Sequence, residues 1–319
     1  MLNDPGVAGN EVVVLDDLSG GFKDNLPDDP RVNFIHGSIT DRRLITRLFE
    51  RYHFRWVYHL AAYAAEGLSH FIRGFNYSNN LMGSMNLINA SVNYGVECFV
   101  FTSSIAVYGT GQVPMREDMV PQPEDPYGIS KYAVELDLKA AHEMFGLDYT
   151  VIRPHNVYGE YQNIGDRYRN VVGIFMNQIL QEKPMTIFGD GRQQRAFSYI
   201  ADIAPLIARA PFVPAARNRI FNIGADRPYT VNELAEKVAE AMGVQANIVY
   251  LPPRNEVATA YADHAACEKV LGECSQTPLT QGLQRMAAWA KSVGSRKSKV
   301  FKEIEIRRCL PEAWASDPS

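Results

Sequence analysis

The sequence predicts an α/β protein built on a doubly wound parallel sheet, followed by a smaller mixed α/β domain. Short β-branched runs alternate with amphipathic helical stretches through the first half of the chain. These runs are almost continuously apolar, which is typical of strands covered on both faces of a parallel sheet. Polar residues follow the runs, and ligands of such folds bind at the carboxyl ends of the strands. We therefore look for chemistry in the residues that follow each strand.

The individual elements can be placed from their patterns. The predicted strands of the first half are residues 11–15, 32–35, 56–60, 98–101 and 149–152, and predicted helices include 42–52 and 79–93. The second half has a predicted helix at 171–181, a strand at 220–223 and a helix opened by 229–234. Thr230 is a candidate cap for that last helix, because Glu233 follows three residues later, as in a capping box.

Composition excludes several classes of protein. The 319 residues include 32 Lys plus Arg and 36 Asp plus Glu, a net charge of −4, which argues against a general nucleic-acid binder. No apolar run approaches the ~18 residues that span a bilayer, and the first residues do not resemble a signal peptide. The four cysteines are too few and too scattered for a disulfide framework or a zinc site. We therefore expect a cytoplasmic protein with no metal, no membrane contact and no nucleic-acid partner.

The sharpest chemical signal is the pair Tyr127 and Lys131. Asp125 can cap a helix whose first residue is Pro126, so the tyrosine and lysine, four residues apart, share one helix face. A free phenol has a pKa near ~10, and a neighbouring ammonium lowers it. The pair is therefore a candidate general acid/base, although the same spacing also arises by chance on many helices.

The pair does not stand alone, and the chain resembles the extended short-chain dehydrogenase/reductase superfamily, in its nucleotide-sugar epimerase/dehydratase group. The resemblance covers residues 11–293. Its motifs, in chain order, are His59-Leu60-Ala61-Ala62, Asn79-Asn80 with Gly83-Ser84, Thr102-Ser103-Ser104, Tyr127 with Lys131, residues 153–159, residues 188–191 with Arg195, and Asn222-Ile223-Gly224. A set of motifs in order is far more specific than any single one.

The resemblance implies a Rossmann-type fold with two domains, one for the cofactor and one for the substrate. Residues 1–155 would form the dinucleotide-binding domain, and residues 196–225 would return to it. Residues 156–195 and 226–319 would form the substrate-binding domain. The resemblance also implies a homodimer, in which the helices at 79–93 and 127–145 form a four-helix contact.

The resemblance assigns catalytic and cofactor roles to individual residues. Ser104 would hydrogen-bond the sugar oxygen being oxidised, Tyr127 would exchange its proton, and Lys131 would bind the nicotinamide ribose. The cofactor would be NAD, because an acid at Asp16 repels the 2′-phosphate of NADP. The expected cofactor-binding residues are Asp16, Asp17, Ser38, Ile39, Leu60, Ala61, Ala62, Asn79, Tyr127 and Lys131.

The substrate implied is a nucleoside-diphosphate sugar. The expected substrate-binding residues are Ser104, Asn156, Asn170, Arg195 and Arg254. Arginine suits the diphosphate because its guanidinium pairs with two oxygens at once. Arg167, Arg169 and Arg192 are further cations in the same part of the chain, which we interpret as surface charge.

Epimerisation is favoured over the related reactions. Dehydratases of the group carry Asp-Glu after the catalytic hydroxyl and decarboxylases tend to carry Glu, whereas this chain has Ile105-Ala106. This predicts oxidation and re-reduction at C4 of a nucleotide hexose, with UDP-hexose as the favoured substrate class. The alternatives are a nucleotide-sugar dehydratase or decarboxylase, and a non-catalytic relative that acts as a binding or scaffold protein.

Two features depart from the family pattern. Gly37-Ser38 stands where the family has Gly-Asp, so Ser38 and the Ile39 backbone would take over the adenine contact. Only 15 residues precede Asp16, whereas a first strand and Gly-rich loop should begin about 20 residues before this acid. Residues 2–6 resemble the last turn of the helix that follows that loop. We therefore expect the first strand to be missing from this sequence, with a start placed too late as the favoured explanation, and weak NAD binding and poor solubility for the chain as given.

Overall fold

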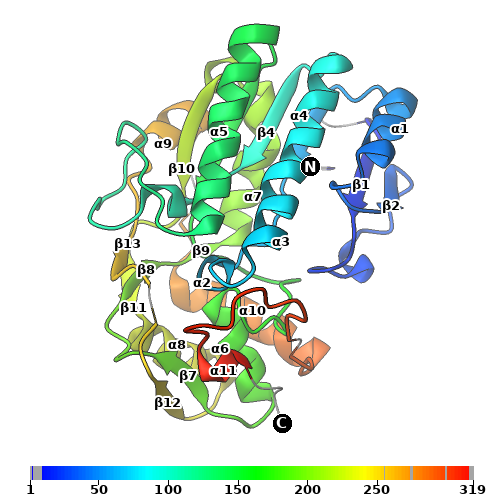
Figure 1. The fold of residues 1–319 in the computed structure, drawn as a ribbon. Helices are drawn as coiled ribbons and strands as arrows, with labels where there is room; N and C mark the ends of the chain where they lie inside the picture. The colour runs from blue at the N-terminus through cyan, green and yellow to red at the C-terminus, as the bar shows by residue number, and fades with distance from the viewer. Residues whose placement is uncertain (1, 3–8, 255, 274–275, 299, 316–319) are drawn as a thin grey trace.

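The centre of the protein is a four-stranded parallel sheet in the order β10-β5-β4-β3 (Figure 1). The computed structural model describes residues 2, 9–254, 256–273, 276–298 and 300–315. The strands of this sheet are β3 (Trp56–His59), β4 (Cys98–Thr102), β5 (Tyr149–Pro154) and β10 (Arg219–Ile223). β10 returns to the sheet beside β5 after a long excursion of the chain.

Helices cover both faces of this sheet, as the apolar strands predict. Phe99 and Phe101 of β4 pack on one face with helices α4 and α5. Cys98 and Val100, which alternate with them, pack on the other face with α7 and α9. The four helices are α4 (Gly83–Asn93), α5 (Pro126–Phe145), α7 (Ile200–Arg209) and α9 (Ala265–Leu271). The doubly wound α/β fold is therefore confirmed.

A second parallel pair, β1 (Val12–Asp16) and β2 (Val32–His36), stands apart from the central sheet. It is attached through α1 (Arg42–Tyr52), which packs with α4 in one apolar cluster. No ladder joins β1 to β3 among the described residues. The expected first strand stays a prediction. Residues 3–6, from the segment predicted to be the last turn of the first helix, lie outside the described residues.

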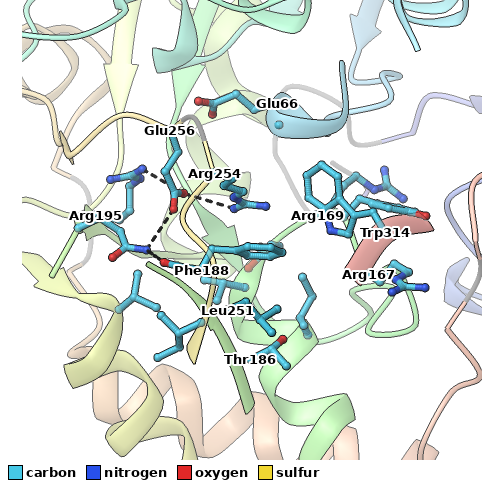
Figure 2. Close-up of a pocket in the computed structure, with 18 of the residues that line it drawn as sticks. Glu66, Arg167, Arg169, Thr186, Phe188, Arg195, Leu251, Arg254, Glu256 and Trp314 are labelled. Carbon is cyan, nitrogen blue, oxygen red and sulfur yellow. Dashed lines mark hydrogen bonds and ion pairs between the residues drawn. The ribbon is translucent and has the colours of Figure 1, made fainter. Parts of the chain in front are cut away.

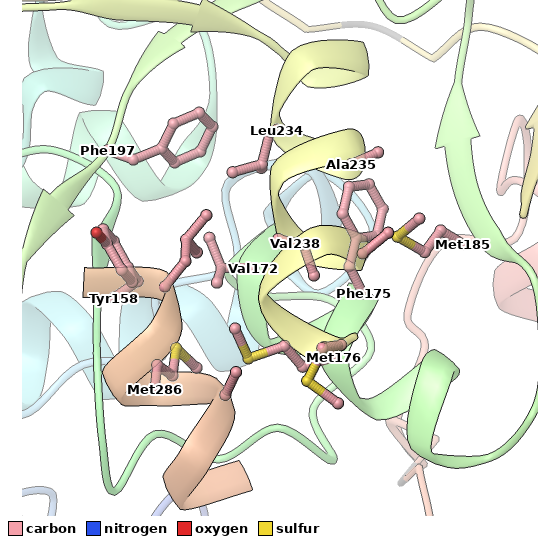
Figure 3. Packing of buried hydrophobic residues seen from close by; sticks show 14 of the residues in the cluster. Tyr158, Val172, Phe175, Met176, Met185, Phe197, Leu234, Ala235, Val238 and Met286 are labelled. Atoms are coloured by element: carbon pink, nitrogen blue, oxygen red, sulfur yellow. The ribbon is translucent and has the colours of Figure 1, made fainter. Parts of the chain in front are cut away.

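The second lobe has its own apolar core between three helices and a strand pair (Figure 3). The helices are α6 (Val171–Leu180), α8 (Val231–Met242) and α10 (Leu279–Val293), and the strands are β7 (Met185–Phe188) and β12 (Ile248–Leu251). A mixed sheet adjoins them, formed by β8 (Gln194–Ala196), β11 (Pro228–Thr230) and β13 (Thr259–Ala260). The predicted capping box of α8 is confirmed, with Thr230 and Glu233 bonded in both directions.

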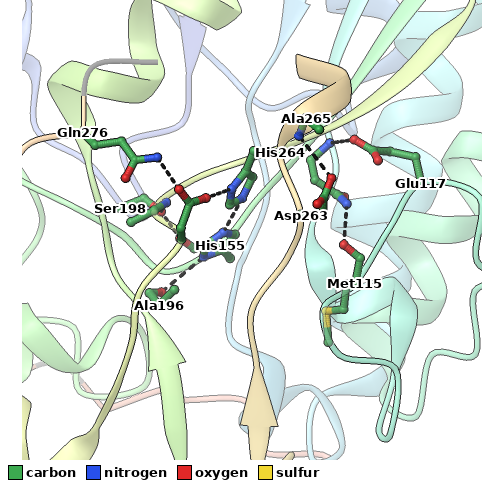
Figure 4. A network of polar contacts seen from close by, with 12 residues as sticks. Met115, Glu117, His155, Ala196, Ser198, Asp263, His264, Ala265 and Gln276 are labelled. Atoms are coloured by element: carbon green, nitrogen blue, oxygen red, sulfur yellow. Dashed lines mark hydrogen bonds and ion pairs between the residues drawn. The ribbon is translucent and has the colours of Figure 1, made fainter. Parts of the chain in front are cut away.

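Buried polar groups connect the two lobes (Figure 4). His155, directly after β5, lies 3.0 Å from His264 between their Nε2 atoms. His264 Nδ1 in turn lies 2.6 Å from the Asp226 carboxylate. The short strands β6 (Val157–Tyr158) and β9 (Ser198–Tyr199) pair at the same junction.

The remaining helical segments are short. They are α2 (Glu66–Ser69), α3 (Arg73–Tyr77), a π-helical turn at Ser78–Met82, α11 (Glu312–Ala315) and 3₁₀ turns at Lys23–Asn25, Ile105–Tyr108, Ala210–Phe212 and Pro214–Ala216. The predicted helix at 79–93 is therefore continuous in direction, but its first turn is π-helical. Within the part of the chain that the structure describes, no helix is long and apolar enough to cross a membrane.

Candidate active site

The N-terminus of α5 is held against the end of β4 by local sequence. The Asp125 side chain accepts a hydrogen bond from the Gly128 amide at 2.9 Å, and Pro126 occupies the first helical turn, as predicted. A Cβ at Gly128 would lie 2.6 Å from the Ala106 carbonyl oxygen. Glycine at this position therefore lets the helix approach the turn after β4, which carries Ser104.

This approach brings together the three predicted catalytic residues. Ser104 and Tyr127 share a side-chain hydrogen bond, and Lys131 Nζ lies 5.8 Å from the centroid of the Tyr127 ring. Lys131 Nζ also donates to the Thr102 carbonyl at 2.7 Å, at the carboxyl end of β4. Tyr127 and Lys131 are both buried.

Burial dominates the acid–base properties of this pair. Loss of solvent raises the pKa of Tyr127 well above its usual range, against the opposing effect of the Ser104 hydrogen bond. Loss of solvent also lowers the pKa of Lys131 to about 7, although the Glu135 carboxylate favours its charged form. Desolvation therefore dominates the pKa of Tyr127, and the expected lowering of that pKa by Lys131 stays a prediction.

A buried ion pair joins α5, the helix that carries Tyr127 and Lys131, to the central sheet. Arg153 on β5 makes two hydrogen bonds to Glu135 on α5, at 2.9 and 2.5 Å. Ser103 donates to the same carboxylate at 2.5 Å. The pair thus ties α5 to the ends of β4 and β5, immediately beside the reacting groups.

A cavity of about 260 Å³ lies over the carboxyl ends of β1 to β3. It is lined by eight of the predicted cofactor residues: Asp16, Asp17, Ser38, Ile39, Leu60, Ala61, Ala62 and Asn79. The small side chains after β3 leave room for a ligand, and the carboxylates after β1 are acceptors for ribose hydroxyls. This donor and acceptor set fits the adenosine portion of NAD.

Asn79 lines this cavity. Its neighbour Asn80 is buried and fixes the loop that follows β3. Asn80 accepts from the Tyr63 amide at 2.8 Å and donates to the Tyr63 carbonyl at 3.1 Å. Both asparagines lie in the π-helical turn Ser78–Met82, and Asn80 is the buried one.

A second cavity of about 360 Å³ lies between the lobes and contains the predicted diphosphate and nucleoside residues (Figure 2). Asn156, Asn170, Arg195 and Arg254 all line it. Both arginines pair with Glu256, at 3.7 and 3.3 Å. Arg254 also lies over the Phe188 ring, 4.6 Å from its centroid.

Asn156 and Asn170 hold the walls of this cavity rather than pointing freely into it. Both have positive φ, which asparagine tolerates better than most residues. Asn156 Nδ2 donates to the Ala196 carbonyl at 3.0 Å, and Asn170 caps α6 through the Val172 amide. The two asparagines therefore contribute to ligand binding partly by fixing the conformation of the loops that line the cavity.

Two of the three arginines interpreted as surface charge belong to the site. Arg167 and Arg169 line the larger cavity, and Arg169 also lines the smaller one. Arg169 lies at 2.8 Å from Asp166, which orients it. Arg192 has 86% of its side chain exposed, as expected of a surface cation. The surface interpretation failed for Arg167 and Arg169 because the loop at 160–170 folds back between the two cavities.

Sequence reasoning missed several residues of the larger cavity, including Glu66, Phe188, Glu256 and Trp314. Phe188 lies in a motif that was recognised, but no local pattern marks the other three. Trp314 comes from α11, near the end of the described chain, and packs against Tyr168 and Phe188. Only the tertiary fold places it there.

Two carboxyl groups near Tyr127 have raised pKa values. Loss of solvent around the carboxyl group, with the Asp125 charge, raises the pKa of Glu66 to about 7, although the residue as a whole is exposed. Burial also raises the pKa of Asp125 to about 6, although it accepts backbone hydrogen bonds. Perturbed carboxyl groups inside a cavity are typical of ligand and catalytic sites.

The fold and the site together define the class of protein. A doubly wound α/β fold with a serine, tyrosine and lysine set beside a dinucleotide cavity is that of a short-chain dehydrogenase/reductase. The profile of the NAD dependent epimerase/dehydratase family matches residues 3–224, and the chain belongs to this family.

Comparisons with individual proteins agree with the family. The chain is 32% identical over 283 residues to a UDP-glucose 4-epimerase of Mycolicibacterium smegmatis, spanning 87% of this chain and 90% of that protein. It is 29% identical over 309 residues to a UDP-glucuronate 4-epimerase of Thermodesulfobacterium geofontis, spanning 93% of each. It also resembles the crystal structure of a Thermotoga maritima UDP-glucose 4-epimerase with UDP-glucose, with a TM-score of 0.84, 32% identity and coverage of 89% and 92%.

Proposed function

We propose that this protein interconverts a UDP-hexose and its C4 epimer by transient oxidation and re-reduction at C4. The observation that carries the proposal is the set of Ser104, Tyr127 and Lys131 at the end of β4, together with a cavity lined by Arg195 and Arg254. NAD is the cofactor of the family. When bound, it supplies the group that takes a hydride from C4 and returns it.

The protein's own residues manage the proton. Tyr127 exchanges a proton with the C4 oxygen, and Ser104 holds that oxygen within reach through a second hydrogen bond. Oxidation needs Tyr127 as the phenolate, which takes the proton of the C4 hydroxyl, and the phenol returns that proton when the C4 carbonyl is reduced. Burial raises the pKa of Tyr127 and opposes this ionisation, whereas the charged form of Lys131 favours it. Lys131, with a pKa near 7, interconverts easily between its charged and neutral forms.

The larger cavity supplies the binding energy for the nucleotide. Arg195 and Arg254 provide cationic donors suited to a diphosphate. Their shared partner Glu256 holds them side by side.

We assign residues 1–155 and 196–225 to cofactor binding, and residues 156–195 and 226–319 to substrate binding. We also assign the protein to the cytoplasm, in keeping with the buried free thiol of Cys98.

Dehydration is the second candidate reaction. Ile105 and Ala106 provide no acid after the catalytic hydroxyl, but Glu66 and Asp125 bring carboxyl groups near Tyr127 from other elements. An elimination needs such a second acid/base. The two reactions differ in product, since only dehydration yields a 4-keto-6-deoxy sugar.

A tyrosine variant tests the proposal. Tyr127→Phe should lower turnover by about 10²–10⁴-fold, because it removes the oxygen that transfers the proton. Binding of UDP should stay unchanged. The matched control is Tyr132→Phe, which removes a half-buried phenol on the same helix and should leave turnover near that of the wild type. A Tyr127→Phe enzyme within a few-fold of wild-type activity would exclude this role.

A further inference from the structure

Glu66 carries a carboxyl group that the proposed reaction does not use. It opens α2, just after the loop that follows β3. The flanking residues Ala65 and Leu68 are buried, and Ser69 Oγ donates to the Glu66 carbonyl at 2.6 Å. This packing fixes the backbone and directs the side chain into the larger cavity, where no described residue hydrogen-bonds its carboxylate (Figure 2).

The position of Glu66 follows from the residues that share the cavity with it. Arg195 and Arg254 line the same cavity. So does Asp125, which caps the helix that carries Tyr127. If the diphosphate lies on the arginines and the reacting C4 hydroxyl lies at Tyr127, the pyranose ring between them must pass Glu66.

The surroundings at this point are rich in carboxylates. Asp125, which is 7% exposed, and Glu256 both raise the pKa of Glu66 through their charges. Carboxylates are good acceptors for sugar hydroxyls. A carboxylate on the sugar itself would instead meet like charge in a partly desolvated cavity, where repulsion is strong.

We propose that Glu66 is a specificity-determining residue, which binds the hydroxyls of an uncharged hexose and rejects a hexuronate. The proposal rests on the proposed function, since it takes the larger cavity as the UDP-sugar site. It also distinguishes between two substrate types that occur among the relatives, a UDP-glucose and a UDP-glucuronate.

Calorimetric binding of UDP, UDP-glucose and UDP-glucuronate to the full chain at pH 8.5 tests the proposal, because Glu66, with a pKa raised to about 7, is ionised there. The wild type should bind UDP-glucose at least tenfold more tightly than UDP-glucuronate. Glu66→Gln should reduce this ratio by about tenfold or more, mainly by tighter binding of UDP-glucuronate. Any change in the binding of UDP itself affects both sugar nucleotides alike and cancels in this ratio. Glu236→Gln, which removes an exposed carboxylate on α8, should behave as the wild type.

Two results would overturn the proposal in different ways. If UDP binds but the wild type does not discriminate, or if Glu66→Gln leaves the ratio unchanged, Glu66 has no role in selection and the proposed function stands. If UDP itself does not bind, the proposed function falls and this proposal falls with it.

Discussion

The histidine pair at the junction of the lobes gives the protein a specific sensitivity to acid. His155 is buried, and its ring stacks on His264 with centroids 5.2 Å apart. Burial lowers the pKa of His155 to about 3, and the His264 charge acts in the same direction. The folded protein therefore holds His155 neutral where the unfolded chain, with a pKa near ~6.5, takes up a proton.

The sign of the pH effect follows from this difference. As pH falls from 7 to 5 the unfolded state binds more protons than the folded state, so stability present at neutral pH is lost. We expect the unfolding free energy of the wild type to fall by about 2 kcal/mol more than that of His155→Gln over this range. Urea denaturation at several pH values measures it, with His36→Gln as an exposed control. Equal slopes for wild type and His155→Gln would rule out the effect.

At the scale of elements, the segment at 300–315 closes one side of the larger cavity. The Glu305 carboxylate accepts from the Gly74 and Phe75 amides, at 2.7 and 2.8 Å, at the start of α3. Further along, Trp314 lies 5.3 Å from the Arg254 guanidinium. The segment therefore positions one of the two arginines assigned to the diphosphate.

Removing the indole should weaken nucleotide binding. A cation–π contact in a desolvated site contributes up to about 2 kcal/mol, so Trp314→Ala should weaken UDP binding by about tenfold. Ile306→Ala, a change at a 40% exposed position of the same segment, should have less than a twofold effect. Calorimetry with UDP gives both values, and unchanged binding in Trp314→Ala would show that Arg254 is positioned by other contacts.

The sequence was informative for elements with local signals. The cap at Asp125, the helical spacing of Tyr127 and Lys131 and the capping box at Thr230 all depend on residues within one or two turns, and all form as predicted. The predicted cofactor residues at the ends of β1, β2 and β3 also line the cavity, because each follows or ends its own strand.

The remainder depends on tertiary contacts that no local pattern contains. Glu66 and Trp314 are 248 positions apart (314 − 66) and meet only around the larger cavity. The raised pKa of Tyr127 likewise reflects the extent of burial, which spacing to Lys131 does not reveal. The sequence therefore predicted the candidate catalytic residues, but it did not predict the residues that surround them in the folded protein.

At the scale of the whole molecule we expect a homodimer through α4 and α5. Leu136, 51% exposed, and the exposed Ala140 form an apolar strip on α5 that faces away from the sheet. Pairing two such helices with their α4 neighbours would bury this strip. Sedimentation at micromolar concentration should show dimers for the wild type and monomers for Leu136→Asp. Val249→Asp, at an exposed position in the other lobe, should remain dimeric. A monomeric wild type would contradict the expectation.

The central claim is that the hydrogen at C4 leaves the sugar and returns to the opposite face of the same sugar. UDP-galactose labelled with deuterium at C4, incubated with the protein and saturating NAD, tests it by NMR of the products. We expect UDP-glucose that retains the deuterium at C4, with no net formation of NADH. Loss of the label to solvent, a 4-keto-6-deoxy product, or no conversion by protein that binds both UDP and NAD would contradict it.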